Sequence, residues 1–111
     1  MAVIDQATFE ELKQMSGADF INELIDAFLE DAPTMIQSMR TAAAAADVET
    51  FRRNAHSLKS NAYTFGAAEL GRLARELEVM GRENNLAIGN KVEVLNQEFE
   101  MVAQELRGLR I

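Results

Sequence analysis

The chain has 111 residues, a formal net charge of −7, one histidine and no cysteine, and its length suits a single domain, residues 1–111, whose core needs no metal or disulfide bond. The missing cysteines exclude zinc fingers and iron–sulfur centres, and the acidic balance argues against a nucleic-acid partner, because such partners normally require a basic face. No apolar run approaches the roughly 20 residues of a transmembrane helix and the N-terminus does not resemble a signal peptide, so we expect a cytoplasmic protein that does not enter membranes.

The composition favours an all-helical fold, because alanine, leucine, glutamate and methionine are abundant and proline occurs once. A short first helix is predicted from Thr8, which has a glutamate three residues on as in a capping box, to about Gly17. A second helix should run from about Asp19 into the alanines at 42–46, with a kink or break at Pro33. Its predicted core-facing stripe comprises Phe20, Leu24, Ala27, Phe28, Met35 and Met39.

Asp47 is the expected N-cap of a third helix, which should end at a turn made by Gly66. Apolar residues recur in this segment at alternating intervals of three and four, the pattern of an amphipathic helix. They are Val48, Phe51, Ala55, Leu58, Ala62 and Phe65. At about 100° per residue, His56 lies about 140° from the centre of this stripe. We therefore predict that His56 faces solvent.

Two further helices complete the prediction. One should span about residues 67–82, and the other should begin at Asn90 after a loop at 84–89 that contains two asparagines and a glycine. The apolar stripe of the last helix is Val92, Leu95, Phe99, Val102, Leu106 and Leu109. Because short connections make long neighbouring helices antiparallel, the predicted fold is all-α: an antiparallel up-and-down four-helix bundle with a short extra N-terminal helix.

The residues near His56 suit a phosphoryl acceptor. An imidazole nitrogen is a good nucleophile and is largely unprotonated near neutral pH. Lys59 and Ser60 follow at three and four residues, the spacing that brings helical side chains together on one face. Lys59 would offset the charge of a phosphoryl group, while Ser60 would leave room for it and could donate a hydrogen bond.

The charge pattern around His56 agrees with this chemistry. Between residues 50 and 68 there are three cations and no carboxylate, and the two besides Lys59 are Arg52 and Arg53. A basic patch on an acidic chain favours an anionic group delivered by a partner. The alternative is a solvated basic face carrying an incidental surface histidine, and charge alone does not distinguish the two.

The stretch from Ala55 to Glu78, AHSLKSNAYTFGAAELGRLARELE, resembles the histidine-containing phosphotransfer (HPt) domain of multistep phosphorelays. That family has a histidine, a lysine three residues on, a small residue next, a glycine ten residues from the histidine and a leucine four later. The matching residues here are His56, Lys59, Ser60, Gly66 and Leu70. The upstream segment FLEDAPTMI is also similar to the family's phenylalanine–leucine start with a proline, and the resemblance spans roughly residues 19–107. The family often has glycine where Ser60 stands, and serine keeps that position small.

The resemblance implies a phosphorelay phosphocarrier. His56 would accept a phosphoryl group from the aspartate of a receiver domain, or of a hybrid sensor histidine kinase, and pass it to the aspartate of a response regulator. The expected partners are therefore receiver domains or hybrid kinases. The receiver would bring Mg²⁺, so we expect no cofactor and no metal site on this chain, which should act as a monomer.

Docking of a receiver needs apolar surface beside His56. The candidates are Tyr63, which shares the arc of His56, together with Phe9, Leu12, Met15, Ile21 and Ile25. The alternative is that the five residues near the N-terminus simply cover the end of the core, and that Tyr63 is a partly exposed helix aromatic.

Other functions fit the residues less well. A di-iron centre needs Glu-x-x-His pairs, but Arg53 precedes His56 by three residues and no second histidine exists. A hydrolase triad is disfavoured because Ser57 and Ser60 lie on a regular helix without an elbow motif. No glycine-rich phosphate loop is present, so the chain should not bind ATP or act as an enzyme by itself.

Two other classes of helical protein also carry a histidine on a helical bundle. The dimerisation domain of a sensor kinase usually has an acidic residue after its histidine and a proline four or five residues later, whereas here Ser57 follows and no proline lies after Pro33. The remaining alternative is a helical interaction module whose His56 is never phosphorylated and which acts by occupying a receiver or kinase.

Overall fold

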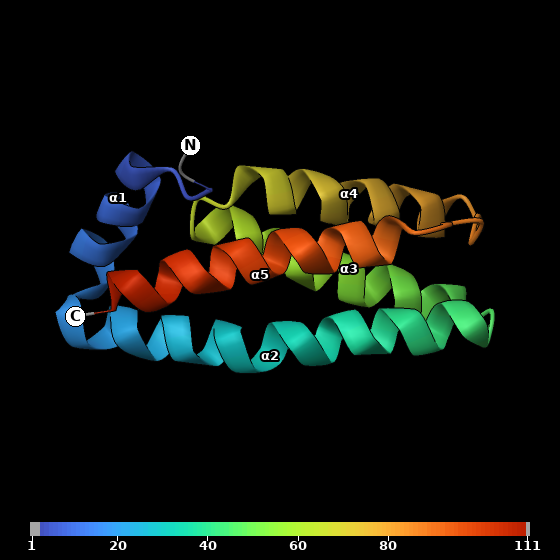
Figure 1. Ribbon diagram of the computed structural model, residues 1–111, viewed down its shortest axis with the longest axis horizontal. Helices are drawn as coiled ribbons and strands as arrows, with labels where there is room; N and C mark the ends of the chain where they lie inside the picture. The colour runs from blue at the N-terminus through green and yellow to red at the C-terminus, as the bar shows by residue number, and fades with distance from the viewer. Residues whose placement is uncertain (1–2, 111) are drawn as a thin grey trace.

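The computed structural model describes residues 3–110, which form five α-helices and no β-strand. The helices are α1 (Gln6–Ser16), α2 (Ala18–Ala44), α3 (Val48–Thr64), α4 (Ala68–Arg82) and α5 (Lys91–Leu109). Figure 1 shows α2 to α5 lying along the long axis of the molecule, with α1 set across one end. The predicted four-helix bundle with an extra N-terminal helix is confirmed. Within the described residues, no helix is long and apolar enough to span a membrane.

Two aspartates cap helix N-termini. The carboxylate of Asp47 accepts a hydrogen bond from the backbone N–H of Thr50 at 3.2 Å, which confirms the predicted start of α3. The carboxylate of Asp5 accepts one from the N–H of Thr8, also at 3.2 Å, so α1 begins at Gln6. The prediction that α1 starts with Thr8 as its cap is therefore wrong, because Asp5 already satisfies the N–H of Thr8.

The buried face of α2 differs from the predicted stripe. Its buried side chains are Ile21, Ile25, Phe28, Ala32, Ile36, Met39 and Ala42. Phe20 and Ala27, which were predicted to face the core, are exposed, Phe20 to 51%. The true face is rotated from the predicted one by about 60°. Because apolar residues occupy more than one side of α2, its own pattern did not determine which side the neighbouring helices would cover.

Pro33 does not break α2, which continues through it as one helix to Ala44. Proline removes one N–H, here the donor to the carbonyl of Leu29, at a cost of about 3 kcal/mol. Pro33 itself is exposed, so water can reach the backbone on that side. Ala32 and Ile36 are fully buried on either side of it. Packing of these flanking turns outweighs the proline penalty, so of the kink or break predicted at Pro33 the break does not occur.

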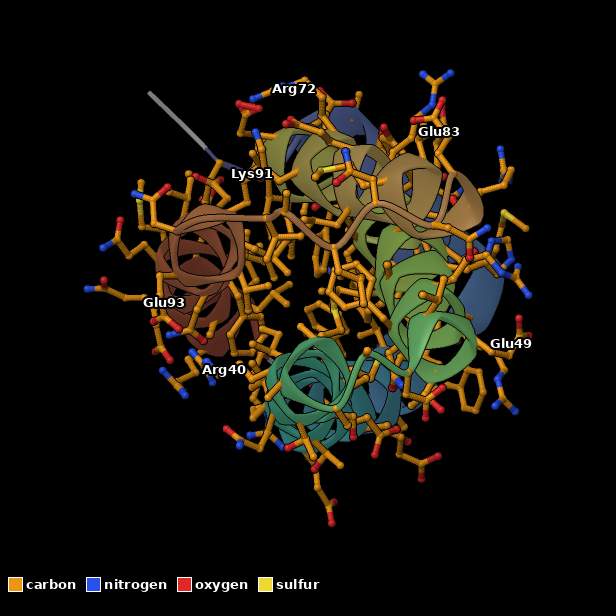
Figure 2. The ribbon with its side chains drawn as sticks, turned by 90° about the vertical axis from the view of Figure 1, so that its right-hand side faces the viewer. Arg40, Glu49, Arg72, Glu83, Lys91 and Glu93 are labelled. Carbon is orange, nitrogen blue, oxygen red and sulfur yellow. The ribbon has the colours of Figure 1, made fainter. Side chains whose placement is uncertain are left out.

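The core is continuous along the bundle. Phe28 is central to it, with its ring centroid 5.2 Å from that of Phe65 and 5.7 Å from that of Phe99. Figure 2, viewed along the bundle, shows apolar side chains filling the space between the helices and charged groups around the outside. Among these, Arg40 pairs with Glu93 at 2.7 Å between α2 and α5. Such exposed pairs contribute little, so burial of the core supplies most of the stability.

Close packing of α3 against α4 is permitted by two buried glycines of α4. A Cβ atom added at Gly81 would lie 3.1 Å from Cβ of Arg52, and one added at Gly71 would lie 2.7 Å from the ring of Tyr63. A side chain at Gly81 would press on α3 at Arg52, and one at Gly71 would displace the ring of Tyr63. The glycines thus bring polar groups of α3 within hydrogen-bonding distance of α4.

The turn after α3 requires glycine. Gly66 has a φ of +83°, as its predicted role demands, and its carbonyl accepts a hydrogen bond from the N–H of Asp5 at 2.8 Å. A Cβ at this position would also lie 3.0 Å from the Asp5 carbonyl oxygen and 3.1 Å from Cβ of Thr8. The N-terminal segment therefore packs directly on this turn.

We expect Gly66→Ala to lower the free energy of unfolding by at least about 1 kcal/mol, because alanine is strained at positive φ and its methyl group would contact Asp5. Gly108→Ala is the matched control, since Gly108 lies in α5 with no atom within 4 Å of an added Cβ. It should be neutral or stabilise by up to about 1 kcal/mol. Urea denaturation measures both, and equal stability of Gly66→Ala and wild type would contradict the prediction.

Candidate functional site

His56 lies near the middle of α3 and its side chain is 56% exposed. The predicted orientation toward solvent is therefore confirmed. The residue before it, Ala55, is fully buried, as is Leu58 two residues later. These two side chains anchor the α3 backbone in the core, so the position of the imidazole is fixed by a rigid helix.

The imidazole contacts a buried carboxylate that the sequence analysis did not identify. Nδ1 of His56 lies 2.6 Å from Oε2 of Glu78 in α4, and the Glu78 side chain is only 3% exposed. No other charged residue among residues 3–110 is buried to this degree. A signal was present, since Gly71, Ala74, Glu78 and Gly81 have the spacing of one helix face. An acidic residue on a face of small residues indicates a partner on the facing helix.

Two cations also contact Glu78. Nζ of Lys59 lies 2.6 Å from its Oε1, and Nη2 of Arg82 lies 3.5 Å from its Oε2. A buried carboxylate without partners would be strongly disfavoured. Burial raises the pKa of the Glu78 carboxyl, but the hydrogen bonds from Lys59 and His56 outweigh burial and leave that pKa below its ordinary value. Glu78 is therefore ionised at neutral pH.

The contact with Glu78 determines which imidazole nitrogen is nucleophilic. An ionised carboxylate accepts hydrogen bonds but cannot donate one, so Nδ1 of His56 carries the proton in this contact. In the neutral imidazole the free lone pair then lies on Nε2. Because Nδ1 is directed to a buried group while more than half of the side chain is exposed, Nε2 is the nitrogen that a partner can reach.

Of the two arginines in the predicted basic patch, one is paired with a carboxylate. Arg52 pairs at 2.7 Å with the carboxylate of Glu49, which lies just before residues 50–68, whereas Arg53 is exposed. The helix α4 contributes another exposed cation, Arg82, whose Nη2 lies 3.5 Å from the Glu78 carboxylate that His56 contacts; the pattern of α3 alone did not reveal it. The cations near His56 therefore come from two helices.

Ser60 is exposed one turn beyond His56 on the same face of α3. Its backbone carbonyl accepts a hydrogen bond from the hydroxyl of Thr64 at 2.9 Å. The structure thus brings His56 and Lys59 together at Glu78 and leaves Ser60 beside them at the surface.

Half of the predicted docking residues are not at the surface. Phe9, Ile21 and Ile25 are buried, with exposed fractions of 1%, 0% and 0%. Their assignment to a docking surface is wrong, because they belong to the core that α1 and α2 share with the rest of the bundle. Leu12 is half-buried, while Met15 is 85% exposed and Tyr63 is 44% exposed.

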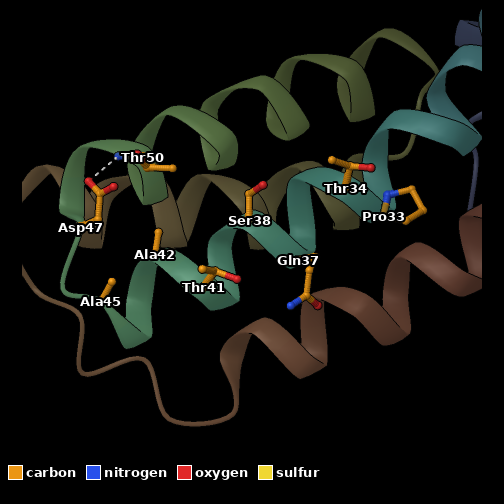
Figure 3. Close-up of a pocket in the computed structure, with 9 residues that line it drawn as sticks. All are labelled: Pro33, Thr34, Gln37, Ser38, Thr41, Ala42, Ala45, Asp47 and Thr50. Atoms are coloured by element: carbon orange, nitrogen blue, oxygen red, sulfur yellow. Dashed lines mark hydrogen bonds between the residues drawn. The ribbon is translucent and has the colours of Figure 1, made fainter.

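A groove between α2 and α3 does not form part of this site. It is lined by Pro33, Thr34, Gln37, Ser38, Thr41, Ala42, Ala45, Asp47 and Thr50. Figure 3 shows its one ionisable side chain, Asp47, bonded to the backbone of Thr50 as the cap of α3. The lining includes none of His56, Lys59 and Glu78, so the groove is separate from the site.

Within residues 3–110, no group of three or more histidine, cysteine, aspartate or glutamate side chains could hold a metal ion. The carboxylate that contacts His56 is that of Glu78, and the cations Lys59 and Arg82 contact the same carboxylate. These cations would repel a metal ion at this place.

Comparisons with known proteins identify relatives of the chain and of its fold. The family model for the Hpt domain matches residues 23–106, which include both His56 and Glu78. The crystal structure of histidine-containing phosphotransfer protein B (HptB) from Pseudomonas aeruginosa PAO1 is similar, with a TM-score of 0.90 and 26% sequence identity. This similarity covers 96% of the present chain and 93% of HptB. A search of curated proteins gave no match.

We expect Glu78→Gln to be less stable than wild type at pH 7 by about 1–3 kcal/mol, because charge-assisted hydrogen bonds are lost. Folding lowers the pKa of the Glu78 carboxyl from its ordinary value of 4.5. Its ionised form therefore stabilises the folded state above about pH 4.5, and this stabilisation is lost as the pH falls through the folded pKa. The difference between the two proteins should therefore shrink in acid. Urea denaturation from pH 7 to pH 3 measures it, with the exposed Glu10→Gln as control. A difference that stayed constant with pH would contradict the assignment of this ionisation.

Proposed function

This chain belongs to the Hpt domain family, and from that premise we propose that His56 is the residue through which it carries phosphoryl groups. Phosphocarrier function in a phosphorelay follows from the family match and from the similarity to HptB. The observation that supports His56 as the acceptor is the 2.6 Å contact between its Nδ1 and the Glu78 carboxylate. That contact leaves a lone pair on the accessible Nε2.

In the proposed reaction, Nε2 attacks the phosphorus of an aspartyl phosphate on a receiver domain. The Nε2–P bond forms as the bond from phosphorus to the aspartate oxygen breaks, and the aspartate leaves as a carboxylate. The imidazole thereby gains positive charge while Nδ1 keeps its proton. Glu78 faces that proton, so its negative charge stabilises the phosphorylated ring. The reverse sequence delivers the group to a second receiver.

The sequence placed Lys59 beside the phosphoryl group and assigned no role to Arg82, whereas the structure places both cations at one carboxylate. In this structure both contact Glu78, so they compensate its charge before any phosphoryl group arrives. We propose that phosphorylation of His56 adds a second anion beside these two cations. Lys59 and Arg82 would then contact both the phosphoryl group and Glu78, and the hydroxyl of Ser60 would donate a hydrogen bond to the phosphoryl group. Since Lys59 is 23% exposed, its attraction to the phosphoryl group is partly screened, and its main effect is positioning.

The partner supplies the rest of the active site in this proposal. Phosphoryl transfer depends on positioning and on neutralisation of charge, and the activated phosphate and Mg²⁺ would come with the receiver domain or hybrid kinase. The chain would need no ATP site of its own. His56, Lys59 and Glu78 come from the adjacent helices α3 and α4, and we propose that the carrier acts as a monomer.

The direct test is transfer of labelled phosphate from phosphorylated receiver domains in the presence of Mg²⁺. We expect a label that is lost in acid and survives alkali, as a phosphoramidate does, and that is absent in His56→Gln. Because His56 is exposed, this variant should keep the helical circular dichroism of wild type. Binding of a receiver without any label would favour the alternative, a module that acts by occupancy.

A second variant tests the role of Glu78 in catalysis. In Glu78→Gln the amide oxygen should face Lys59, so its NH₂ group would face Nδ1 of His56 and favour the tautomer protonated on Nε2. We expect transfer to slow by at least about tenfold with little change in receiver affinity. Nitrogen-15 NMR of the imidazole should detect the tautomer change directly. A normal rate together with the altered tautomer would remove Glu78 from the mechanism.

A further inference from the structure

Tyr63 is an exposed aromatic residue on the same side of α3 as His56. The two are seven residues apart, which is about 20° short of two full helical turns and about 10 Å along the axis. Tyr63 is 44% exposed, so more than half of the residue is covered by its neighbours. This contact restricts the movement of its side chain.

The ring of Tyr63 takes the place of the side chain that Gly71 lacks. A Cβ built at Gly71 would lie 2.7 Å from Cε1, 2.7 Å from Cζ and 2.9 Å from Cδ1 of Tyr63. Gly71 lies inside α4, where glycine costs about 1 kcal/mol relative to alanine, and it has no positive φ that would require glycine. The close approach of the Tyr63 ring accounts for it.

A partner that transfers a phosphoryl group to His56 must cover the surface around it. A typical interface buries about 800 Å² on each partner, which corresponds to a disc of about 16 Å radius, and Tyr63 lies well inside that distance. Rigid, partly exposed aromatic side chains are frequent anchors of interfaces, because they bury much area at low cost in conformational entropy.

We infer that Tyr63 is a specificity-determining contact for the receiver domain, and that Gly71 is the positioning residue that holds its ring. The inference rests on the proposed function, since it takes the receiver on His56 as the occupant of this surface. Tyr63 would contribute to recognition and not to the chemistry at Nε2. Its loss should therefore change KM for the phosphorylated receiver and leave the rate at saturating receiver nearly constant.

The experiment compares transfer from a phosphorylated receiver with labelling by phosphoramidate, a small donor that needs no docking surface. We expect Tyr63→Ala to raise KM about tenfold and Tyr63→Phe to stay close to wild type. Gly71→Ala should also raise KM by displacing the ring. Met101→Ala is the matched control, because Met101 is 52% exposed but belongs to α5, on the opposite side of the bundle from α3 (Figure 2).

Each result bears on one of the two proposals. A KM for Tyr63→Ala within twofold of wild type would overturn the role of Tyr63, whatever Gly71→Ala does to stability. An equal loss of phosphoramidate labelling and receiver transfer in Tyr63→Ala would also overturn it, since the residue would then act on His56 itself. Failure of phosphoramidate to label wild-type His56 would count against the proposed function instead. In that case, affinities of the same variants for the receiver bound to beryllofluoride would still decide whether Tyr63 is a contact.

Discussion

The buried carboxylate of Glu78 is the constraint on which the site depends. A charge that is only 3% exposed is tolerated in a protein interior only when donors surround it. Here the donors come mainly from the facing helix, with Nδ1 of His56 and Nζ of Lys59 each at 2.6 Å. The electrostatic requirement of Glu78 therefore fixes the relative positions of α3 and α4 as well as the orientation of the imidazole. Structural and chemical roles coincide in one side chain.

Small residues of α4 make that arrangement possible. Gly71 and Gly81 flank Glu78 in sequence and sit against Tyr63 and Arg52 of α3. A side chain at Gly81 would press on Arg52 of α3, and one at Gly71 would displace the ring of Tyr63. The glycines weaken α4 as an isolated helix but gain close contact with α3. In α4, close packing against α3 therefore outweighs the low helix propensity of the two glycines.

The resulting site is built to hold a nucleophile and not to activate a phosphate. It orients one imidazole, sets its tautomer and balances charge, which are the contributions a carrier can make to a reaction that runs in both directions. This role suits the function that we propose for this member of the Hpt domain family, in which a partner would bring the activated group.

Five helices and the outward direction of His56 could be predicted from local patterns, because these features depend on apolar spacing and capping within single helices. The regular stripe of α3, the cap at Asp47 and the turn at Gly66 are local features, and all three were predictable. The spacing of Lys59 from His56 was readable for the same reason. Which face of α2 is buried depends on how the neighbouring helices pack against it, so Phe20 is exposed and Ile21 is not. The tertiary structure also decided that Glu78 and Arg82 join the site, because they lie on a different helix and their distance from His56 depends on how α3 and α4 pack together, which no pattern within one helix specifies.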